Sequence, residues 1–254
     1  MLRLENRAAI ITGGGHGIGR AYCLRLAKEG AAVVVADIDL SGAEETRKLV
    51  EQDGGRALAV RVDVGDEQST LAMAEATMKA YGKVDILVNN AAVFATIPIS
   101  RVSFEKVPLD EWDKVMLVNL KGMWLCCRAV APFMKKQNYG KIVNISSGSI
   151  FSGQGMRIHY VTSKAGVVGF TRTLARELGD FSITVNTLTP GSTLSEPQDN
   201  AKAVEFRQSG VATRCLKRVQ IPEDLVGAMI FLCSSESDFM TGQTMVVDGG
   251  NMMI

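Results

Sequence analysis

Short, nearly continuous apolar runs alternate with longer segments of helical periodicity along almost the whole chain. Continuous runs are typical of strands covered on both faces, because a half-solvated strand alternates apolar and polar positions. The pattern predicts seven strands, at 8–12, 32–37, 57–63, 86–89, 141–146, 184–189 and 245–247. It also predicts helices, at 18–29, 42–52, 66–81, 110–136, 160–178 and 222–234.

The alternation of buried strands with helices indicates an α/β fold: a Rossmann-type, doubly wound parallel sheet with helices on both faces. No internal repeat or linker divides residues 1–254, so we expect a single domain. The segment 190–222 breaks the rhythm, because it is polar and irregular with weak helical character at 200–208. It follows the carboxyl end of a strand, where such sheets bind ligands. We therefore interpret it as a substrate lid in preference to a surface excursion.

The charge balance argues against two classes of partner. Lys and Arg number 28 and Asp and Glu 27, which leaves a formal net charge of +1. Proteins that bind nucleic acid or anionic membranes carry a basic excess or patch, so we expect neither partner. We find no apolar run of the ~18 residues that a membrane helix needs and no signal-peptide stretch at the start.

The cysteines favour a reducing, cytoplasmic location. They are odd in number and lie in apolar segments, and they form no CxxC or Cys/His cluster, so we expect buried thiols and no metal site. The five are Cys23, Cys126, Cys127, Cys215 and Cys233.

A glycine-rich turn follows the first strand and opens a helix. Gly13, Gly17 and Gly19 form the pattern TGxxxGxG within Thr12–Gly19. Glycines let the backbone approach a pyrophosphate closely, and the helix N-terminus supplies amide donors and positive potential. A plain strand-to-helix turn also favours glycine, so this turn alone is weak support for a dinucleotide site.

Asp37 adds a second feature of a dinucleotide site. It ends the second strand, 24 residues beyond Gly13, where an acid accepts hydrogen bonds from the hydroxyls of the adenosine ribose. Its carboxylate would repel a 2′-phosphate, and neither His16 nor Ile38 supplies a fixed positive charge to offset that repulsion. The sequence therefore favours NAD over NADP.

Tyr160 and Lys164 are four residues apart in a segment of helical periodicity, so their side chains share one face. A tyrosine hydroxyl titrates near pH ~10, but a nearby ammonium and a cationic nicotinamide favour the phenolate. A tyrosine hydroxyl with a lowered pKa can exchange a proton with the substrate oxygen while a hydride is transferred at the adjacent carbon. The spacing also occurs in ordinary amphipathic helices.

Taken together, the motifs resemble those of the classical short-chain dehydrogenases/reductases over essentially the whole chain. The closing stretch 222–250 and the His159–Tyr160 pair look similar to secondary-alcohol dehydrogenases of that family. The matches occur in family order: Thr12–Gly19, Asp63–Val64, Asn89–Ala92, Asn119, Ser147, Tyr160–Lys164, Pro190–Gly191 and Asp248–Gly250.

The resemblance implies four catalytic roles. Tyr160 would be the general acid/base, and Lys164 would hold the nicotinamide ribose and depress the tyrosine pKa. Ser147 would hydrogen-bond the substrate oxygen. Asn119 would fix a water that connects Lys164 to solvent.

The resemblance also assigns the cofactor contacts. Asp63 and Val64 would flank the adenine, Asn89 would contact the adenosine side, and Thr193 would meet the nicotinamide carboxamide. Ala92 replaces the usual glycine of the family's NNAG pattern. The expected cofactor-binding set is Gly13, Gly15, His16, Gly17, Ile18, Gly19, Asp37, Ile38, Asp63, Val64, Asn89, Ala91, Tyr160, Lys164, Pro190, Gly191 and Thr193.

The expected substrate wall is an apolar cleft with few fixed charges, suited to a hydrophobic secondary alcohol or its ketone. Its residues would be Phe94, Phe151, Met156 and Leu194. The family likeness and the helical segment 118–134, which is apolar nearly all round, suggest a homotetramer, and the tail 251–254 could pack across its interface.

Two other functions remain open. A reductase of 3-oxoacyl thioesters shares the fold, but usually prefers NADPH and needs basic residues such as Lys135 and Lys136 to hold a carrier. A catalytically silent nucleotide-binding scaffold typically lacks the tyrosine or the lysine, and both are present here.

Overall fold

The apolar runs form one parallel sheet. In the computed structural model, which describes residues 2–94, 97–195 and 201–253, seven strands pair in the order β3-β2-β1-β4-β5-β6-β7. They are β1 (Ala8–Thr12), β2 (Ala32–Asp37), β3 (Arg56–Arg61), β4 (Ile86–Asn89), β5 (Gly140–Ile145), β6 (Ile183–Pro190) and β7 (Thr244–Val247). Every pairing is parallel. The predicted doubly wound sheet is confirmed.

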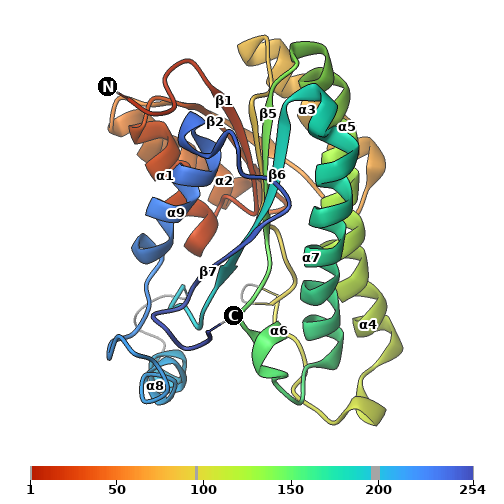
Figure 1. The fold of residues 1–254 in the computed structure, drawn as a ribbon, viewed down its shortest axis with the longest axis vertical. Coiled ribbons are helices and arrows are strands. Elements are labelled where there is room, and N and C mark those ends of the chain that lie inside the picture. The colour runs from red at the N-terminus through yellow and green to blue at the C-terminus, as the bar shows by residue number, and fades with distance from the viewer. Residues whose placement is uncertain (1, 95–96, 196–200, 254) are drawn as a thin grey trace.

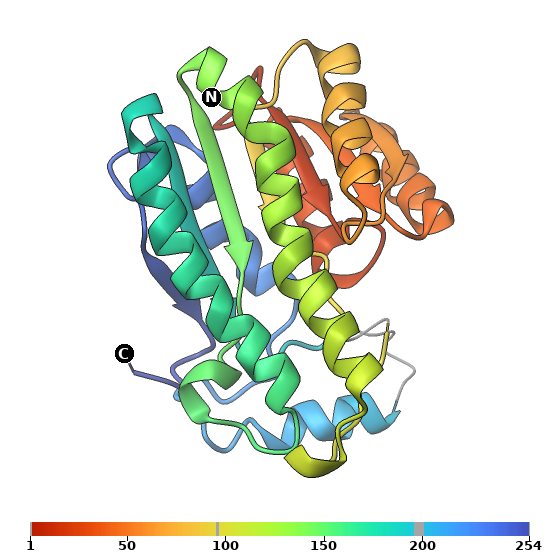
Figure 2. The ribbon, with the colours of Figure 1, turned by 90° about the vertical axis from the view of Figure 1, so that its right-hand side faces the viewer.

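Helices cover both faces of the sheet. Figures 1 and 2 show α1, α2 and α9 on one side and α3, α5 and α7 on the other. Two short additions, α6 and α8, lie near the carboxyl ends of the strands (Figure 1). The helices are α1 (Gly17–Lys28), α2 (Leu40–Gln52), α3 (Glu67–Tyr81), α4 (Leu109–Met116), α5 (Met123–Gln137), α6 (Ser149–Ser152), α7 (Ile158–Leu178), α8 (Ala201–Ser209) and α9 (Glu223–Cys233).

Side-chain alternation along the strands divides the core into two clusters. In β1, Ala9 and Ile11 pack toward α1 and α9, whereas Ile10 packs toward α5 on the opposite face. Because both faces are buried, the strands need apolar residues at successive positions. This requirement explains the continuous apolar runs of the sequence.

The predicted helix 110–136 is continuous, but its hydrogen-bonding pattern changes in the middle. α4 and α5 are joined without a break by a π-helical segment, η2 (Leu117–Gly122), which contains Asn119. Such segments occur frequently at functional sites. The whole stretch Leu109–Gln137 is apolar and long enough to cross a membrane by length and composition, which corrects the expectation that no segment reaches that length. Half of its most apolar window is buried inside the protein, as in a core helix.

The outer face of this helix carries exposed apolar side chains. Leu117 and Trp124 are 39% and 44% exposed, and the guanidinium of Arg128 lies 5.7 Å from the centre of the Trp124 ring. The expected burial of this helix on all sides is therefore incomplete within one chain. The homotetramer stays a prediction.

We expect Asp238→Ala to destabilise the fold. The Lys141 ammonium on β5 is buried, and its partners are the Asp238 carboxylate at 2.7 Å and the Ser237 hydroxyl at 3.4 Å. Removal of the carboxylate leaves a buried cation without its counter-charge. Because the Asp238 side chain is 56% exposed, we expect a loss of about 2 kcal/mol, less than for a fully buried pair.

Urea denaturation measures this loss. Glu51→Ala, which opens an exposed ion pair with Arg47, is the matched control and should cost no more than about 0.5 kcal/mol. The double variant Lys141→Met/Asp238→Ala should recover most of the stability, because no charge is left buried. Equal midpoints for Asp238→Ala and Glu51→Ala would contradict the assignment.

Candidate active site

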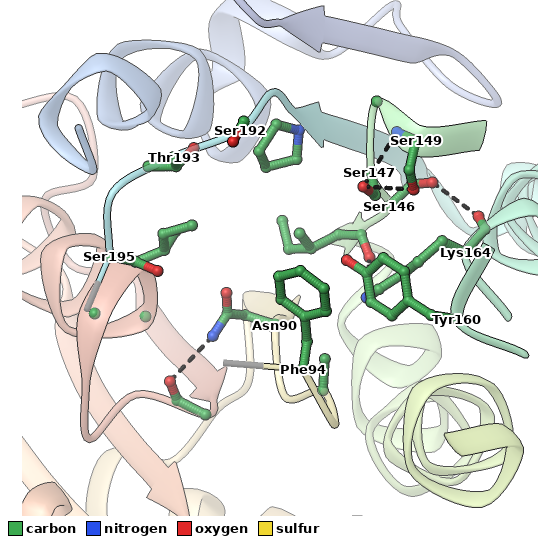
Figure 3. Close-up of a pocket in the computed structure, with 18 of the residues that line it drawn as sticks. Asn90, Phe94, Ser146, Ser147, Ser149, Tyr160, Lys164, Ser192, Thr193 and Ser195 are labelled. Atoms are coloured by element: carbon green, nitrogen blue, oxygen red, sulfur yellow. Dashed lines mark hydrogen bonds between the residues drawn. The ribbon is translucent and has the colours of Figure 1, made fainter. Parts of the chain in front are cut away.

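A cavity of about 1360 Å³ opens at the carboxyl ends of the strands. Loops after β1, β2, β4, β5 and β6 contribute to its wall, and Figure 3 shows it from within. Typical pockets for a single small ligand measure roughly 300–1,000 Å³. The cavity therefore has room for a dinucleotide and a second molecule beside it.

The glycine turn after β1 is packed so closely that side chains cannot fit. A Cβ on Gly13 would lie 2.9 Å from the Ala91 Cα, and one on Gly19 would overlap the Gly13 carbonyl oxygen. Gly13 also has a positive φ of 65°. The Asn90 amide nitrogen, Nδ2, fixes the turn by donating to the carbonyl oxygens of Thr12 at 3.1 Å and Gly13 at 3.0 Å. The bare backbone that results faces the cavity.

Asp37 holds the same turn from β2. Its carboxylate accepts hydrogen bonds from the Gly15 N–H at 2.8 Å and the Asp39 N–H at 3.0 Å. The neighbouring Asp39 carboxylate lies 2.8 Å from His16 Nε2, and this contact lowers the pKa of Asp39 to about 2. This end of the cavity is therefore acidic.

Arg20 is a cavity residue that sequence reasoning missed. Its guanidinium donates to the Gly15 carbonyl oxygen at 2.7 Å and pairs with the Glu45 carboxylate at 2.7 Å. Its charge is thus already paired within the protein. An arginine following a glycine turn by one residue carries no sequence signal of such a role.

Tyr160 on α7 projects into the cavity with its ring stacked on Phe94 (Figure 3). The ring centres are 4.5 Å apart and the planes differ by 26°. Burial raises the pKa of the Tyr160 hydroxyl, and a hydrogen bond with Ser147 is the largest of the effects that lower it. Ser147 also accepts a hydrogen bond from the Ser149 hydroxyl at 2.9 Å. The structure thus brings the predicted serine and tyrosine together.

The Lys164 side chain reaches the carboxyl end of β5, and its effect on the Tyr160 pKa stays a prediction. Its ammonium donates to the Ile145 carbonyl oxygen at 2.8 Å and lies 6.0 Å from the centre of the Tyr160 ring. Burial lowers the pKa of Lys164 to about 8. The cations that lower the Tyr160 pKa are Arg157 and Arg207, which the sequence analysis did not single out.

Asn119 connects the loop after β4 with α7. Its side-chain oxygen accepts from the Val93 N–H at 2.8 Å, and its amide donates to the Ser163 hydroxyl at 3.2 Å. Asn119 and Lys164 also share a small internal cavity of about 10 Å³. That volume is at the lower limit of what one water molecule needs.

Asn89 is turned away from the main cavity. Its amide donates to the Asn144 side-chain oxygen at 2.8 Å and to Cys127 Sγ at 3.3 Å, so it braces β4 against β5. The next residue, Asn90, lines the cavity in its place. Gly15 also lies off the wall, although its N–H binds Asp37. The remaining predicted cofactor residues line the cavity: Gly13, His16, Gly17, Ile18, Gly19, Asp37, Ile38, Asp63, Val64, Ala91, Tyr160, Lys164, Pro190, Gly191 and Thr193.

The substrate end differs most from expectation. Phe94 lines the cavity, but Phe151, Met156 and Leu194 do not, and the first two are 38% and 55% exposed. The expected cleft with few fixed charges is wrong, because three arginines line the wall: Arg157, Arg207 and Arg214.

Two predicted segments contribute to this wall. The described part of 190–222 supplies Ser192, Thr193 and Ser195 besides two of the arginines (Figure 3), while residues 196–200 lie outside the described chain. Asn251 and Met252 of the tail also line the cavity of their own chain, whereas we expected the tail to pack across an interface. Whether 190–222 opens and closes as a lid stays a prediction.

Known proteins are similar to this protein along almost the whole chain. The protein-family model described as enoyl-(acyl carrier protein) reductase matches residues 13–251. An uncharacterized oxidoreductase of Mycobacterium tuberculosis is 42% identical over 98% of both chains. The 3-oxoacyl-(acyl-carrier-protein) reductase FabG of Thermotoga maritima is 35% identical, covering 98% of this chain and 99% of its own.

A solved structure gives the same picture. A 7α-hydroxysteroid dehydrogenase complexed with NADH and 7-oxoglycochenodeoxycholic acid is similar with a TM-score of 0.90 and 34% identity, covering 98% of this chain and 95% of that one. Its fold is the three-layer arrangement described above. With the family model, these relatives and the sheet topology in agreement, the chain belongs to the short-chain dehydrogenase/reductase family of oxidoreductases.

Proposed function

We propose that this protein is an NAD-dependent oxidoreductase that interconverts a secondary alcohol and its ketone. The observation that carries the proposal is the convergence of Tyr160, Ser147 and Lys164 on the cavity that the glycine turn also lines. A proton-transfer group therefore lies in the same cavity as a surface suited to a dinucleotide.

The cavity residues fit NAD. Bare backbone at Gly13 and Gly19 would meet the pyrophosphate, and Asp37 would accept hydrogen bonds from the adenosine ribose. Thr193, whose hydroxyl donates to the Gly191 carbonyl oxygen at 3.2 Å, would face the carboxamide. When bound, NAD would accept a hydride from the alcohol carbon or, in its reduced form, return one to the ketone.

The chain's own residues would handle the proton. Ser147 would orient the substrate oxygen, and the Tyr160 hydroxyl would take a proton from the alcohol or give one to the ketone. Lys164 would hold the nicotinamide ribose, and its 10 Å³ cavity with Asn119 supports a single water as the next carrier of the proton. Phe94 and Ile97 would contact the hydrocarbon body of the substrate. We also propose a homotetramer, which the exposed apolar side chains of Leu117 and Trp124 support. Its proposed location is the cytoplasm.

A second candidate is reduction of 3-oxoacyl thioesters. Its support is the 35% identity to a 3-oxoacyl-(acyl-carrier-protein) reductase. Asp37 disfavours the NADPH that such an enzyme usually uses. The two functions differ in substrate and cofactor, so one assay separates them.

That assay measures NADH formation across secondary alcohols, polyols and 3-hydroxyacyl thioesters, with NADP run in parallel. We expect turnover with NAD on a secondary alcohol. Turnover confined to the thioesters with NADP would establish the second candidate, and the absence of turnover on the whole panel with both cofactors would refute the proposal.

Asp37→Ala tests whether Asp37 binds the adenosine ribose and so selects NAD over NADP. The variant loses the acceptor for the ribose hydroxyls and the charge that repels a 2′-phosphate, so we expect the NAD/NADP ratio of kcat/KM to fall about tenfold or more. The ratio is the readout because Asp37 also holds Gly15 in place, so its loss should weaken the binding of both cofactors. Asp39→Asn removes a neighbouring charge as the control. An unchanged ratio in Asp37→Ala would show that Asp37 does not discriminate between the cofactors.

A further inference from the structure

Three arginine side chains form the wall of the cavity at its substrate end. Arg157 precedes α7, Arg207 lies on α8 and Arg214 follows α8. Their exposed fractions are only 5%, 6% and 3%. A buried cation is costly unless something replaces its lost hydration. Each arginine therefore needs compensation, either from the protein or from a ligand.

The protein itself compensates Arg214. Its guanidinium donates to the Ser192 carbonyl oxygen at 2.5 Å and to the Arg218 carbonyl oxygen at 3.1 Å. The charge of Asp248 also favours its protonated form. Arg214 thus ties the loop after β6 to the segment that precedes α9, and we assign it a structural role.

Arg157 is in a different position. Across residues 2–94, 97–195 and 201–253, its guanidinium donates no hydrogen bond and meets no carboxylate within 4 Å. The guanidinium lies over the face of Phe94, with 5.6 Å between the guanidinium carbon and the ring centre. Burial, followed by repulsion from Arg101, lowers its pKa, and Arg207 adds further repulsion. An anion bound in the cavity would offset the cost of burying this charge and the repulsion from Arg101 and Arg207.

The Arg157 guanidinium lies at the Tyr160 end of the cavity, against the ring that stacks on Tyr160. Phe94 stacks on Tyr160 with the ring centres 4.5 Å apart, and the Arg157 guanidinium carbon lies 5.6 Å from the centre of the same Phe94 ring. One aromatic ring therefore separates the arginine from the tyrosine. The charges of Arg157 and Arg207 both lower the Tyr160 pKa, which places both within electrostatic reach. Arg207 also donates to the Ser192 hydroxyl at 3.3 Å, on the side of the cavity opposite Tyr160 (Figure 3).

Among the described residues of the cavity wall, the acidic side chains lie elsewhere or are already bound. Asp37, Asp39 and Asp63 belong to the glycine-turn end. The Asp248 carboxylate accepts hydrogen bonds from three successive backbone N–H groups, of residues 250, 251 and 252, at 2.9–3.0 Å. The cavity is therefore divided into an acidic end for the adenosine and a basic end beside Tyr160.

We propose that the substrate carries a carboxylate close to its carbinol carbon and that Arg157 binds this carboxylate. The inference rests on the proposed function and names its substrate class, a hydroxy acid or the matching oxo acid. Guanidinium forks match carboxylate oxygens in geometry and charge. The phosphates of a coenzyme A or carrier thioester lie at the far end of a long arm, whereas Arg157 packs against Phe94, the ring that stacks on Tyr160. The anion therefore belongs to the body of the substrate.

Matched substrates test the proposal. The oxidation of 3-hydroxy-3-phenylpropanoate, its methyl ester and its coenzyme A thioester would be followed with NAD as acceptor. We expect kcat/KM for the acid to exceed that for the ester at least about tenfold, because the ester has the same hydrocarbon body without the charge. An ester or thioester that reacts as well as the acid would overturn the inference and leave the proposed function intact.

Variants then assign the preference to residues. Arg157→Met keeps an apolar stem against Phe94 and removes the charge, so the acid/ester ratio should fall at least about tenfold. Arg157→Lys keeps the charge without the guanidinium fork, so it should keep part of the ratio. Arg218→Met, at an exposed arginine paired with Asp224, is the matched control and should keep the wild-type ratio. An acid/ester ratio that survives in Arg157→Met would overturn the assignment.

A binding measurement separates the two proposals. Calorimetry on the NADH-loaded protein would compare 3-phenylpropanoate with 3-phenylpropanamide, which requires no turnover. We expect the carboxylate to bind at least about tenfold more tightly, and Arg157→Met to remove the difference. Arg157-dependent binding of the acid without turnover of any alcohol would refute the proposed function alone. Equal binding of acid and amide would refute the carboxylate site. A fall in NADH affinity as the sole effect of Arg157→Met would assign the arginine to the cofactor.

Discussion

Tyr160→Phe is expected to lower kcat by roughly 10²- to 10⁴-fold, the range in which a positioned acid/base contributes. The variant removes only the hydroxyl, and the remaining ring can still stack on Phe94. NAD affinity should therefore change less than about threefold. Steady-state kinetics and a fluorescence titration with NADH measure the two quantities on the same preparation.

Tyr22→Phe is the matched control. Tyr22 is also buried, but it lies on the core-facing side of α1 and its hydroxyl has no hydrogen-bond partner among the described residues. Removal of an unsatisfied buried hydroxyl should leave kcat unchanged and leave stability equal or slightly higher. If Tyr160→Phe kept more than about a tenth of the wild-type kcat, a second group would have to move the proton.

The fold could be predicted because the local and the global signals agree. β1, β2 and β4 have the predicted bounds, since their apolar runs are flanked by glycine or polar residues and are buried on both faces. The helix 110–136 was predicted without its π-helical segment at 117–122, because its apolar periodicity continues through that segment. Such an insertion changes hydrogen bonding along the helix but not its composition.

The candidate site could be predicted only where a motif fixes the backbone. The glycine turn fixes the backbone after β1, and the spacing of Tyr160 and Lys164 places both side chains on one face of a helix. Asn89 and Asn90 show the limit, because consecutive residues at a strand end face opposite sides, and only the pairing of β4 with β5 decides which one braces the sheet. The type of residue alone cannot distinguish them.

The substrate end was predicted poorly for a related reason. Arg157 and Arg207 are 50 residues apart in sequence, and only the packing of α7 and α8 around the cavity brings both charges near Tyr160. An isolated arginine in sequence most often has a solvated side chain. Phe151, by contrast, is apolar in sequence but lies on the short α6 and is partly exposed. Loops place side chains through tertiary contacts, which hydrophobic patterning does not report.

Gly19→Ala is expected to lower NAD affinity by at least about 100-fold and the free energy of unfolding by about 2–3 kcal/mol, the cost of overpacking a close contact. The new methyl group would overlap the Gly13 carbonyl oxygen and lie 2.7 Å from the Asn90 amide nitrogen. To make room, the first turn of α1 must separate from the loop, which breaks the hydrogen bond from Asn90 to Gly13. The affinity loss then follows from displaced backbone donors.

Gly227→Ala provides the control within a helix. Gly227 is exposed on α9, and a Cβ there would meet nothing within 4 Å, so alanine should stabilise the protein by about 0.5–1 kcal/mol through its better helix propensity. Urea denaturation and NADH titration of both variants separate a general glycine effect from the close approach at the turn. Normal NADH binding by a folded Gly19→Ala protein would show that α1 can move away from Gly13 without loss of the cofactor surface, and the glycine turn would then not be the element that holds the pyrophosphate.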